Sequence, residues 1–198
     1  MKFIHKSLFL LLAILFLPTT TQAQTLSGIS IDFGLPDSYD AFVLSPAAHI
    51  KSNNHVWSIG PALLFSYGDQ IEQRESPKLT GLTLGYTNYL IETEEKVSLF
   101  FALDLWLQRV SDVQESRYFD TGTNSFESFT IKQTDNTAQL FVGFGAMVKL
   151  SDQVSIKQTI STGVNFTSRS ATSPFNNFTD PLISQDWLLK TGLFYRLN

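Results

Sequence analysis

Apolar and polar residues alternate with a period of two over most of the chain beyond its N-terminal segment. Near the middle, Leu99 and Leu103 share one face of an extended backbone while Ser98 and Ala102 lie on the other. The pattern is typical of strands, and no later segment of ten or more residues shows the apolar spacing of a helix. We therefore predict an all-β protein of about eight strands. The alternating segments are 28–35, 41–51, 56–67, 81–90, 97–108, 139–150, 154–166 and 186–197.

The length and the two faces of these segments favour a membrane. Strands of soluble proteins average about five or six residues, whereas a tilted membrane-spanning strand needs about 9 to 11. One face of each segment is large and aliphatic, and the other is unusually small. Glycine on a strand face exposed to water costs stability and packs nothing, but inside a narrow barrel it makes room for neighbouring rings. The inward glycines are Gly60, Gly81, Gly85, Gly143, Gly145, Gly163 and Gly192, and the inward rings are Phe100, Trp106, Phe141 and Phe194.

These faces predict a closed antiparallel up-and-down transmembrane β-barrel with apolar side chains outside and polar ones inside. Trp106 falls on the inward face, so it is either a residue that plugs the lumen or the sign of a β-bulge. The connections sort by length. Those at 68–78, 112–130 and 168–184 are expected to be long loops at one end, with short turns and both ends of the barrel at the other.

The N-terminal segment has the features of a secretory signal. Lys2 and Lys6 precede an apolar stretch from Leu8 to Leu17, and small residues lie before Gln24. We predict that residues 1–23 are a cleaved signal peptide and that residues 24–198 form the barrel. Cleavage lowers the basic count from 14 to 12 against 18 acidic residues, which argues against nucleic acid as a partner.

The final strand must pair with the first to close the barrel, because unpaired backbone is not tolerated in hydrocarbon. Its sequence, KTGLFYRLN, resembles the C-terminal assembly signal of outer-membrane barrels, with Lys190, Gly192, Tyr195 and Leu197 at the matching positions. The usual terminal Phe is replaced by Leu197 followed by Asn198. With its signal, strand count and loop pattern, the chain resembles the small OmpA/OmpX-type barrels of Gram-negative bacteria. That resemblance implies residence in the outer membrane, contact with its lipid and recognition by the barrel-assembly machinery.

An eight-stranded barrel has an interior just wide enough for side chains, so we expect a plugged lumen. Isolated charges there are costly, and we predict a network in which aspartates neutralise lysines or Arg196. A narrow gated ion path is the alternative. The predicted lumen charge network comprises Asp32, Asp104, Lys149, Lys157, Lys190 and Arg196.

Other residues are assigned to the membrane interfaces and the surface. The predicted interfacial girdles are Trp57 and Tyr195 near the short turns, and Tyr67 and Trp187 near the long loops. Exposed rings on the loops suggest a surface protein or glycan ligand, or simply pack the loops together. These rings are Tyr118, Phe119, Phe126, Phe175 and Phe178.

The sequence offers little for catalysis. After cleavage only His49 and His55 remain, His49 facing inward and His55 in a short turn, so we expect no catalytic residues and no enzymatic activity. Two histidines and no cysteine also predict no metal site, and we expect no cofactor. We favour a structural or surface-interaction protein that acts through its loops. Two alternatives remain. One is the narrow gated ion path, and the other is binding or transport of a small apolar molecule through a lateral opening where Pro46 and Pro61 interrupt adjacent strands.

Overall fold

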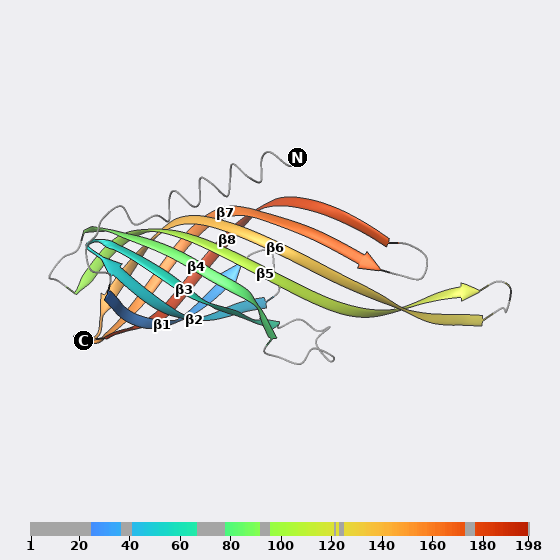
Figure 1. Cartoon of the computed structure of the whole chain (residues 1–198), viewed down its shortest axis with the longest axis horizontal. Coiled ribbons are helices and arrows are strands. Elements are labelled where there is room, and N and C mark those ends of the chain that lie inside the picture. Colours follow the sequence, from blue (N-terminus) through green and yellow to red (C-terminus); the bar gives the residue numbers. More distant parts are fainter. Residues whose placement is uncertain are drawn as a thin grey trace.

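Eight antiparallel strands form a closed ring in chain order. The computed structural model describes residues 25–36, 41–66, 78–91, 96–120, 122, 125–172 and 177–197, and the predicted signal peptide at 1–23 lies outside them. Each strand pairs with the next, and β8 pairs with β1 to close the barrel (Figure 1). The strands are β1 Thr25–Pro36, β2 Ala41–Ser52, β3 His55–Ser66, β4 Lys78–Ile91, β5 Val97–Asp120, β6 Ser125–Lys149, β7 Val154–Thr172 and β8 Asn177–Arg196.

The distribution of side chains is inside-out compared with a soluble barrel. On β6 the outward Phe144 is 62% exposed, while the inward Phe141 is fully buried. Serines, threonines, glutamines and charged residues share the interior with a few aromatic rings, and the outer wall is Leu, Ile, Val and Phe. The fold prediction is therefore confirmed. Among the described residues, no helix is long and apolar enough to cross a bilayer.

Inward glycines accommodate the inward rings, as the sequence suggested. A Cβ atom on Gly145 would lie 2.3 Å from the ring of Phe100, and one on Gly34 would lie 2.3 Å from the indole of Trp106. Both separations are far below van der Waals contact, so any larger residue would displace a ring from the interior. Trp106 is buried in the interior, and the register of β5 against its neighbours is regular at that position, so it does not mark a β-bulge.

The expectation of long loops at 112–130 and 168–184 is wrong. β5 and β6 stay paired out to Asp120 and Ser125, and β7 and β8 stay paired out to Thr172 and Asn177. At about 3.3 Å per residue, the 24-residue β5 is roughly 80 Å long, far more than a bilayer requires. Figure 1 shows β5 and β6 continuing well past the ends of β1 to β4. The alternation of apolar and polar residues fades in this extension, where consecutive residues such as 125–128 of β6 are all exposed.

The opposite end of the barrel has tight connections. Asn53 adopts a positive φ of 53° in the β2–β3 turn, a conformation that asparagine tolerates well. In the β6–β7 turn, the Ser151 hydroxyl accepts hydrogen bonds from the backbone N–H groups of Gln153 and Val154. The backbone N–H of Leu197 donates to Ser27 O, which ties the end of the chain to the first strand.

Candidate functional site

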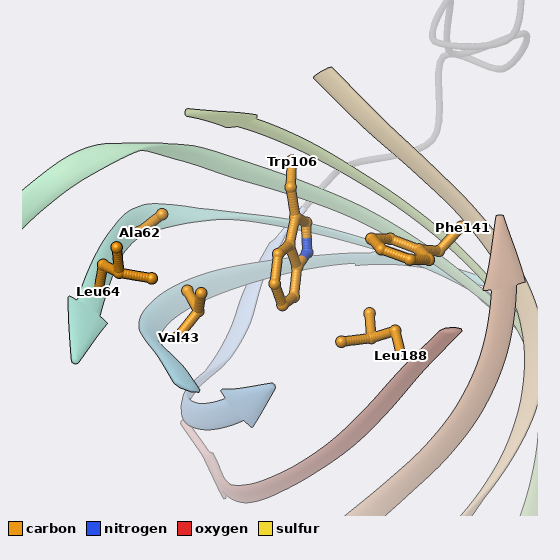
Figure 2. Close-up of a cluster of buried hydrophobic side chains, with 6 residues drawn as sticks. All are labelled: Val43, Ala62, Leu64, Trp106, Phe141 and Leu188. Atoms are coloured by element: carbon orange, nitrogen blue, oxygen red, sulfur yellow. The ribbon is translucent and has the colours of Figure 1, made fainter. Parts of the chain in front are cut away.

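The interior is the most densely organised part of the molecule, and it consists of layers. One apolar cluster contains Val43, Ala62, Leu64, Trp106, Phe141 and Leu188 (Figure 2). A second cluster, nearer the tight turns, contains Phe100, Ala102 and Met147, with Tyr89 and Phe194 packed against it. Along β5 the inward residues run from Trp106 through Asp104 to Ala102. The strand therefore places a carboxylate between the two apolar layers.

Asp104 and Lys190 form an ion pair in this middle layer. Lys190 Nζ donates to Asp104 Oδ1 at 2.5 Å, and both side chains are almost completely buried. The pair joins β5 to β8 across the lumen, 86 residues apart in sequence. Burying two charges is costly, and their attraction in a poorly screened interior offsets that cost only while both partners remain.

Two more charged residues predicted from the sequence, Lys157 and Asp32, are buried in this layer. Lys157 Nζ donates to Thr87 Oγ1 at 3.0 Å and lies 4.9 Å from the centroid of the Phe100 ring. Asp32 Oδ1 faces Gly192 so closely that a Cβ atom there would lie 1.9 Å from it. The layer thus holds two aspartates and two lysines, and its charges balance.

Lys149 and Arg196 belong to a different environment. Each is the last residue of its strand, on β6 and β8, at the end with the tight turns. Lys149 is half-buried and Arg196 is exposed. Both residues are on the inward face of their strands by the alternation. They nevertheless contact solvent, because they lie at the open end of the barrel. The buried charge layer is therefore smaller than the predicted six-residue network.

Sequence reasoning missed a third buried carboxylate. Asp186 is fully buried, accepts from Gln139 Nε2 at 2.9 Å and accepts from the backbone N–H of Trp187 at 2.8 Å. The alternation of β8 could have predicted that Asp186 faces inward, because it lies four residues before Lys190 and so on the same face of the strand. Gln139 faces inward for the same reason, because it lies two residues before the inward Phe141 on β6.

A small polar cavity adjoins the ion pair. It has a volume of about 10 Å³ and is lined by Asp32, Ser45, Ser58, Thr83, Asp104 and Lys190, together with Gly34, Val43, Ala47, Leu84, Gly85 and Trp106. Among the described residues, Asp32 Oδ1 and Asp104 Oδ2 have no hydrogen-bond donor. A space of this size and polarity fits about one water molecule.

The two remaining histidines are both engaged. His49 Nε2 and Ser30 Oγ are 2.8 Å apart, and the imidazole and the Phe194 ring make a T-shaped contact with 5.1 Å between centroids. This serine and histidine are both buried in the wall of the lumen. His55 Nδ1 lies 2.7 Å from the hydroxyl of Tyr86 beside the β2–β3 turn. In the part of the chain that the structure describes, no group of three or more His, Cys, Asp or Glu side chains is placed to hold a metal.

Three of the four aromatic residues predicted for the interfaces are described by the structure, and these lie on the outer surface. Near the tight turns, the ring of Trp57 contacts that of Tyr86 in a tilted arrangement, with 4.5 Å between centroids. At the same end, the Tyr195 hydroxyl donates to Gln153 Oε1. Trp187 is exposed on the outside of β8, next to Leu188, the last β8 residue that pairs with β1. Tyr67 lies outside the described residues. Tyr86 belongs with the turn-side group, although sequence reasoning did not name it.

The residues of the predicted assembly signal serve the closure of the barrel. Lys190 is the partner of Asp104, Gly192 leaves space for Asp32, and Tyr195 faces outward opposite Ile29 of β1. Leu197 is half-buried beyond the last pair.

Comparison with known proteins supports the architecture. No protein-family model matches the sequence, and no curated protein is similar to it. Among solved structures, a major outer membrane protein from Thermus thermophilus superposes with a TM-score of 0.50 at 13% identity, covering 87% of this chain and 100% of that one. This chain has the fold of a small outer-membrane β-barrel.

Two further barrels are similar at lower scores. Neisserial surface protein A gives a TM-score of 0.47 at 13% identity, over 89% of this chain and 100% of its own. The outer membrane protease OmpT from Escherichia coli gives 0.39 at 10% identity, over 88% of this chain and 94% of its own. At these scores and identities, neither likeness carries an argument about this chain.

Proposed function

We propose that this protein is a non-catalytic outer-membrane barrel whose closed lumen makes it a rigid anchor for a projecting β-ribbon that makes surface contacts. The ribbon consists of the outer parts of β5 and β6, residues 109–120 and 125–136, and this name is kept below. The observation that supports the proposal is the contrast between a barrel filled by packed layers and a pair of strands that continues far beyond it.

The ribbon has the features of an interaction surface. The pairing of β4 with β5 ends at Gln108, so within the described residues the outer part of β5 has β6 as its only neighbour. A long strand edge of this kind is a template for adding a strand from another protein. Phe126, near the tip, is 74% exposed. It is the only one of the five predicted loop rings whose side chain the structure describes.

The base of the ribbon is fixed by an ion pair. Arg169 of β7 donates from Nε and Nη2 to the two carboxylate oxygens of Asp135 on β6, at 3.1 and 3.2 Å. The hydrogen bond that Arg169 donates to Asp135 raises the pKa of Arg169 above its usual range. Such fork-shaped contacts restrict orientation as well as adding attraction. The barrel therefore presents the ribbon in a defined direction.

Protease treatment of intact cells tests this proposal. Trypsin should cut at the exposed Arg117 of the ribbon and leave the barrel protected in the membrane. Mass spectrometry of the released and retained fragments locates the cut, and a variant Arg117→Gln is the matched control. Cleavage at this site only after the cells are lysed would show that the ribbon does not face the exterior, and the proposal would fail.

A second candidate, the lateral opening, is favoured by the pairing of β2 with β3. Pairs are present at Leu44 with Leu63 and at Ala48 with Ile59, but the three positions between them are unpaired. The register places Pro46 directly opposite Pro61, and proline has no N–H to donate. The interruption opens toward the small polar cavity, where only about 10 Å³ is free. Passage of a solute would therefore require displacement of packed side chains.

Replacing both prolines with valine distinguishes the two candidates. The variant Pro46→Val/Pro61→Val restores two N–H donors on lipid-facing positions, and each new hydrogen bond should add about 1 kcal/mol to the free energy of unfolding. Urea unfolding from lipid vesicles measures this gain, and binding of laurate tests the opening. If the barrel is closed, neither protein binds laurate. Binding by the native protein that the variant loses would favour the lateral opening instead.

A further inference from the structure

Two buried carboxylates of the middle layer line the same small cavity. Asp32 Oδ1 and Asp104 Oδ2 have no hydrogen-bond donor among the described residues, although Asp32 is only 7% and Asp104 only 4% exposed. Both residues line the polar cavity of about 10 Å³ beside the ion pair. A buried acceptor without a donor is costly, and two of them on one cavity indicate that a donor belongs in it.

Two hydroxyl groups of the cavity are engaged elsewhere. Thr83 Oγ1 donates to Gly60 O at 3.2 Å and lies 2.6 Å from Ser45 Oγ. Because each hydroxyl has one hydrogen, Ser45 is the donor in the second contact. Lys190 donates to the other oxygen of Asp104. None of these three side chains therefore supplies the donor.

The buried charges of the layer select the kind of donor. Asp32 and Asp104 are balanced there by Lys157 and Lys190, so a bound cation would give the layer a net positive charge away from bulk water. A water molecule adds no charge, has two hydrogens to donate and needs about the space that the cavity offers. Water is therefore the occupant that satisfies both oxygens at the lowest cost.

Apolar side chains lie on both sides of the cavity along the barrel. Toward the ribbon, Val43 and Trp106 line it and belong to the cluster in Figure 2. Toward the tight turns is the second cluster, with Phe100 and Ala102 from the same strand as Asp104. A molecule in the cavity is thus enclosed by packed side chains, and we expect it to exchange slowly with bulk water.

We propose that this cavity is the binding site of one structural water molecule, which donates one hydrogen to Asp32 Oδ1 and the other to Asp104 Oδ2. The water links β1 to β5 across the lumen, next to the direct bond from Lys190 on β8. The charged layer is then held together by a bound solvent molecule as well as by the ion pair. This inference concerns the interior of the barrel and goes beyond the proposed surface role of the ribbon.

A crystal structure of the full barrel, at a resolution that shows ordered water, tests the site. One peak of electron density should be within hydrogen-bond distance of both carboxylate oxygens. The two distances identify the occupant. Water lies about 2.7–3.0 Å from its acceptors, whereas small hard cations lie at about 2.0–2.6 Å from their oxygen ligands. We expect the longer distances.

Oxygen-17 relaxation dispersion of the barrel in detergent micelles counts long-lived waters in solution. Ala47→Val adds two methyl groups on a wall of the cavity and should remove one long-lived water per barrel. Ala146→Val is the matched control, because Ala146 pairs with the outward Leu99 and lies away from the cavity. It should leave the count unchanged. Both variants are first checked for heat-modifiable gel mobility.

Three outcomes would overturn the inference. The first is a crystal structure in which the two carboxylates are in direct contact, which would indicate a shared proton. The second is a peak at cation distances. The third is an unchanged count of long-lived waters in a folded Ala47→Val barrel. Should that variant fail to fold, the density in the native crystal decides alone. A ribbon that fails the protease test leaves this inference untouched.

Discussion

Replacement of Asp104 by leucine will lower the free energy of unfolding by about 3–5 kcal/mol, the usual cost of leaving a buried charge without its partner. Leucine is similar to aspartate in size but leaves the Lys190 ammonium between two apolar layers. Urea unfolding in lipid vesicles, followed by tryptophan fluorescence, measures the loss.

The double variant Asp104→Leu/Lys190→Met is the control for this prediction. It removes both charges, and replacement of a buried pair by apolar residues is often neutral or stabilising. Most of the lost stability should therefore return. Asp152→Asn, in the exposed β6–β7 turn, should have no measurable effect. A single variant as stable as the native protein would show that Lys190 is solvated, and that the lumen is wetter than its packing indicates.

Replacement of Trp106 by alanine should cost about 3–5 kcal/mol, the range for removing a large aromatic side chain from a packed interior. Its ring makes an edge contact with Phe141 at 5.6 Å between centroids, and Figure 2 shows it standing between Val43 and Leu188. The indole thus fills the centre of the apolar layer nearer the ribbon. Urea unfolding measures the loss of stability, with Trp57 and Trp187 as remaining fluorophores.

The same variant tests the closed lumen through its conductance. In planar bilayers the native barrel should show no stable current steps, because the interior around the ion pair holds only about 10 Å³. Trp106→Ala removes the largest plug residue and should produce brief openings. Large stable steps in the native protein would contradict the plugged lumen and favour the gated ion path.

The strands inside the membrane were predictable because lipid imposes alternation on them. Positions such as Phe144 and Phe141 can be assigned to opposite faces from the sequence alone. The ribbon was not predictable in this way, since between Arg109 and Asp120 no apolar environment selects one face. The two strands of the ribbon are held together by backbone hydrogen bonds. These bonds place no requirement on side-chain polarity, so the sequence there shows no period of two.

The interior was predictable by residue but only partly by contact. Alternation placed Asp32, Asp104, Lys157 and Lys190 on the inward face, where the structure has them buried. The pairing of Asp104 with Lys190 rather than Lys157 depends on how far the strands are staggered around the barrel, which a single sequence does not state. The opposition of Pro46 and Pro61 is likewise a matter of register.

The central claim is that aliphatic side chains surround this barrel and face lipid. The chain contains no cysteine, so single nitroxide labels can be attached at introduced cysteines on the outward face of β7, at Ile156, Ile160, Val164 and Ser168. In lipid vesicles, collision with oxygen should exceed collision with a water-soluble nickel chelate at the first three positions, most strongly at Ile160. At Ser168 the order should reverse. Labels at Ile160 that are immobile and shielded from both reagents would indicate a dry protein core, and labels open to nickel would indicate water; either result would contradict the claim.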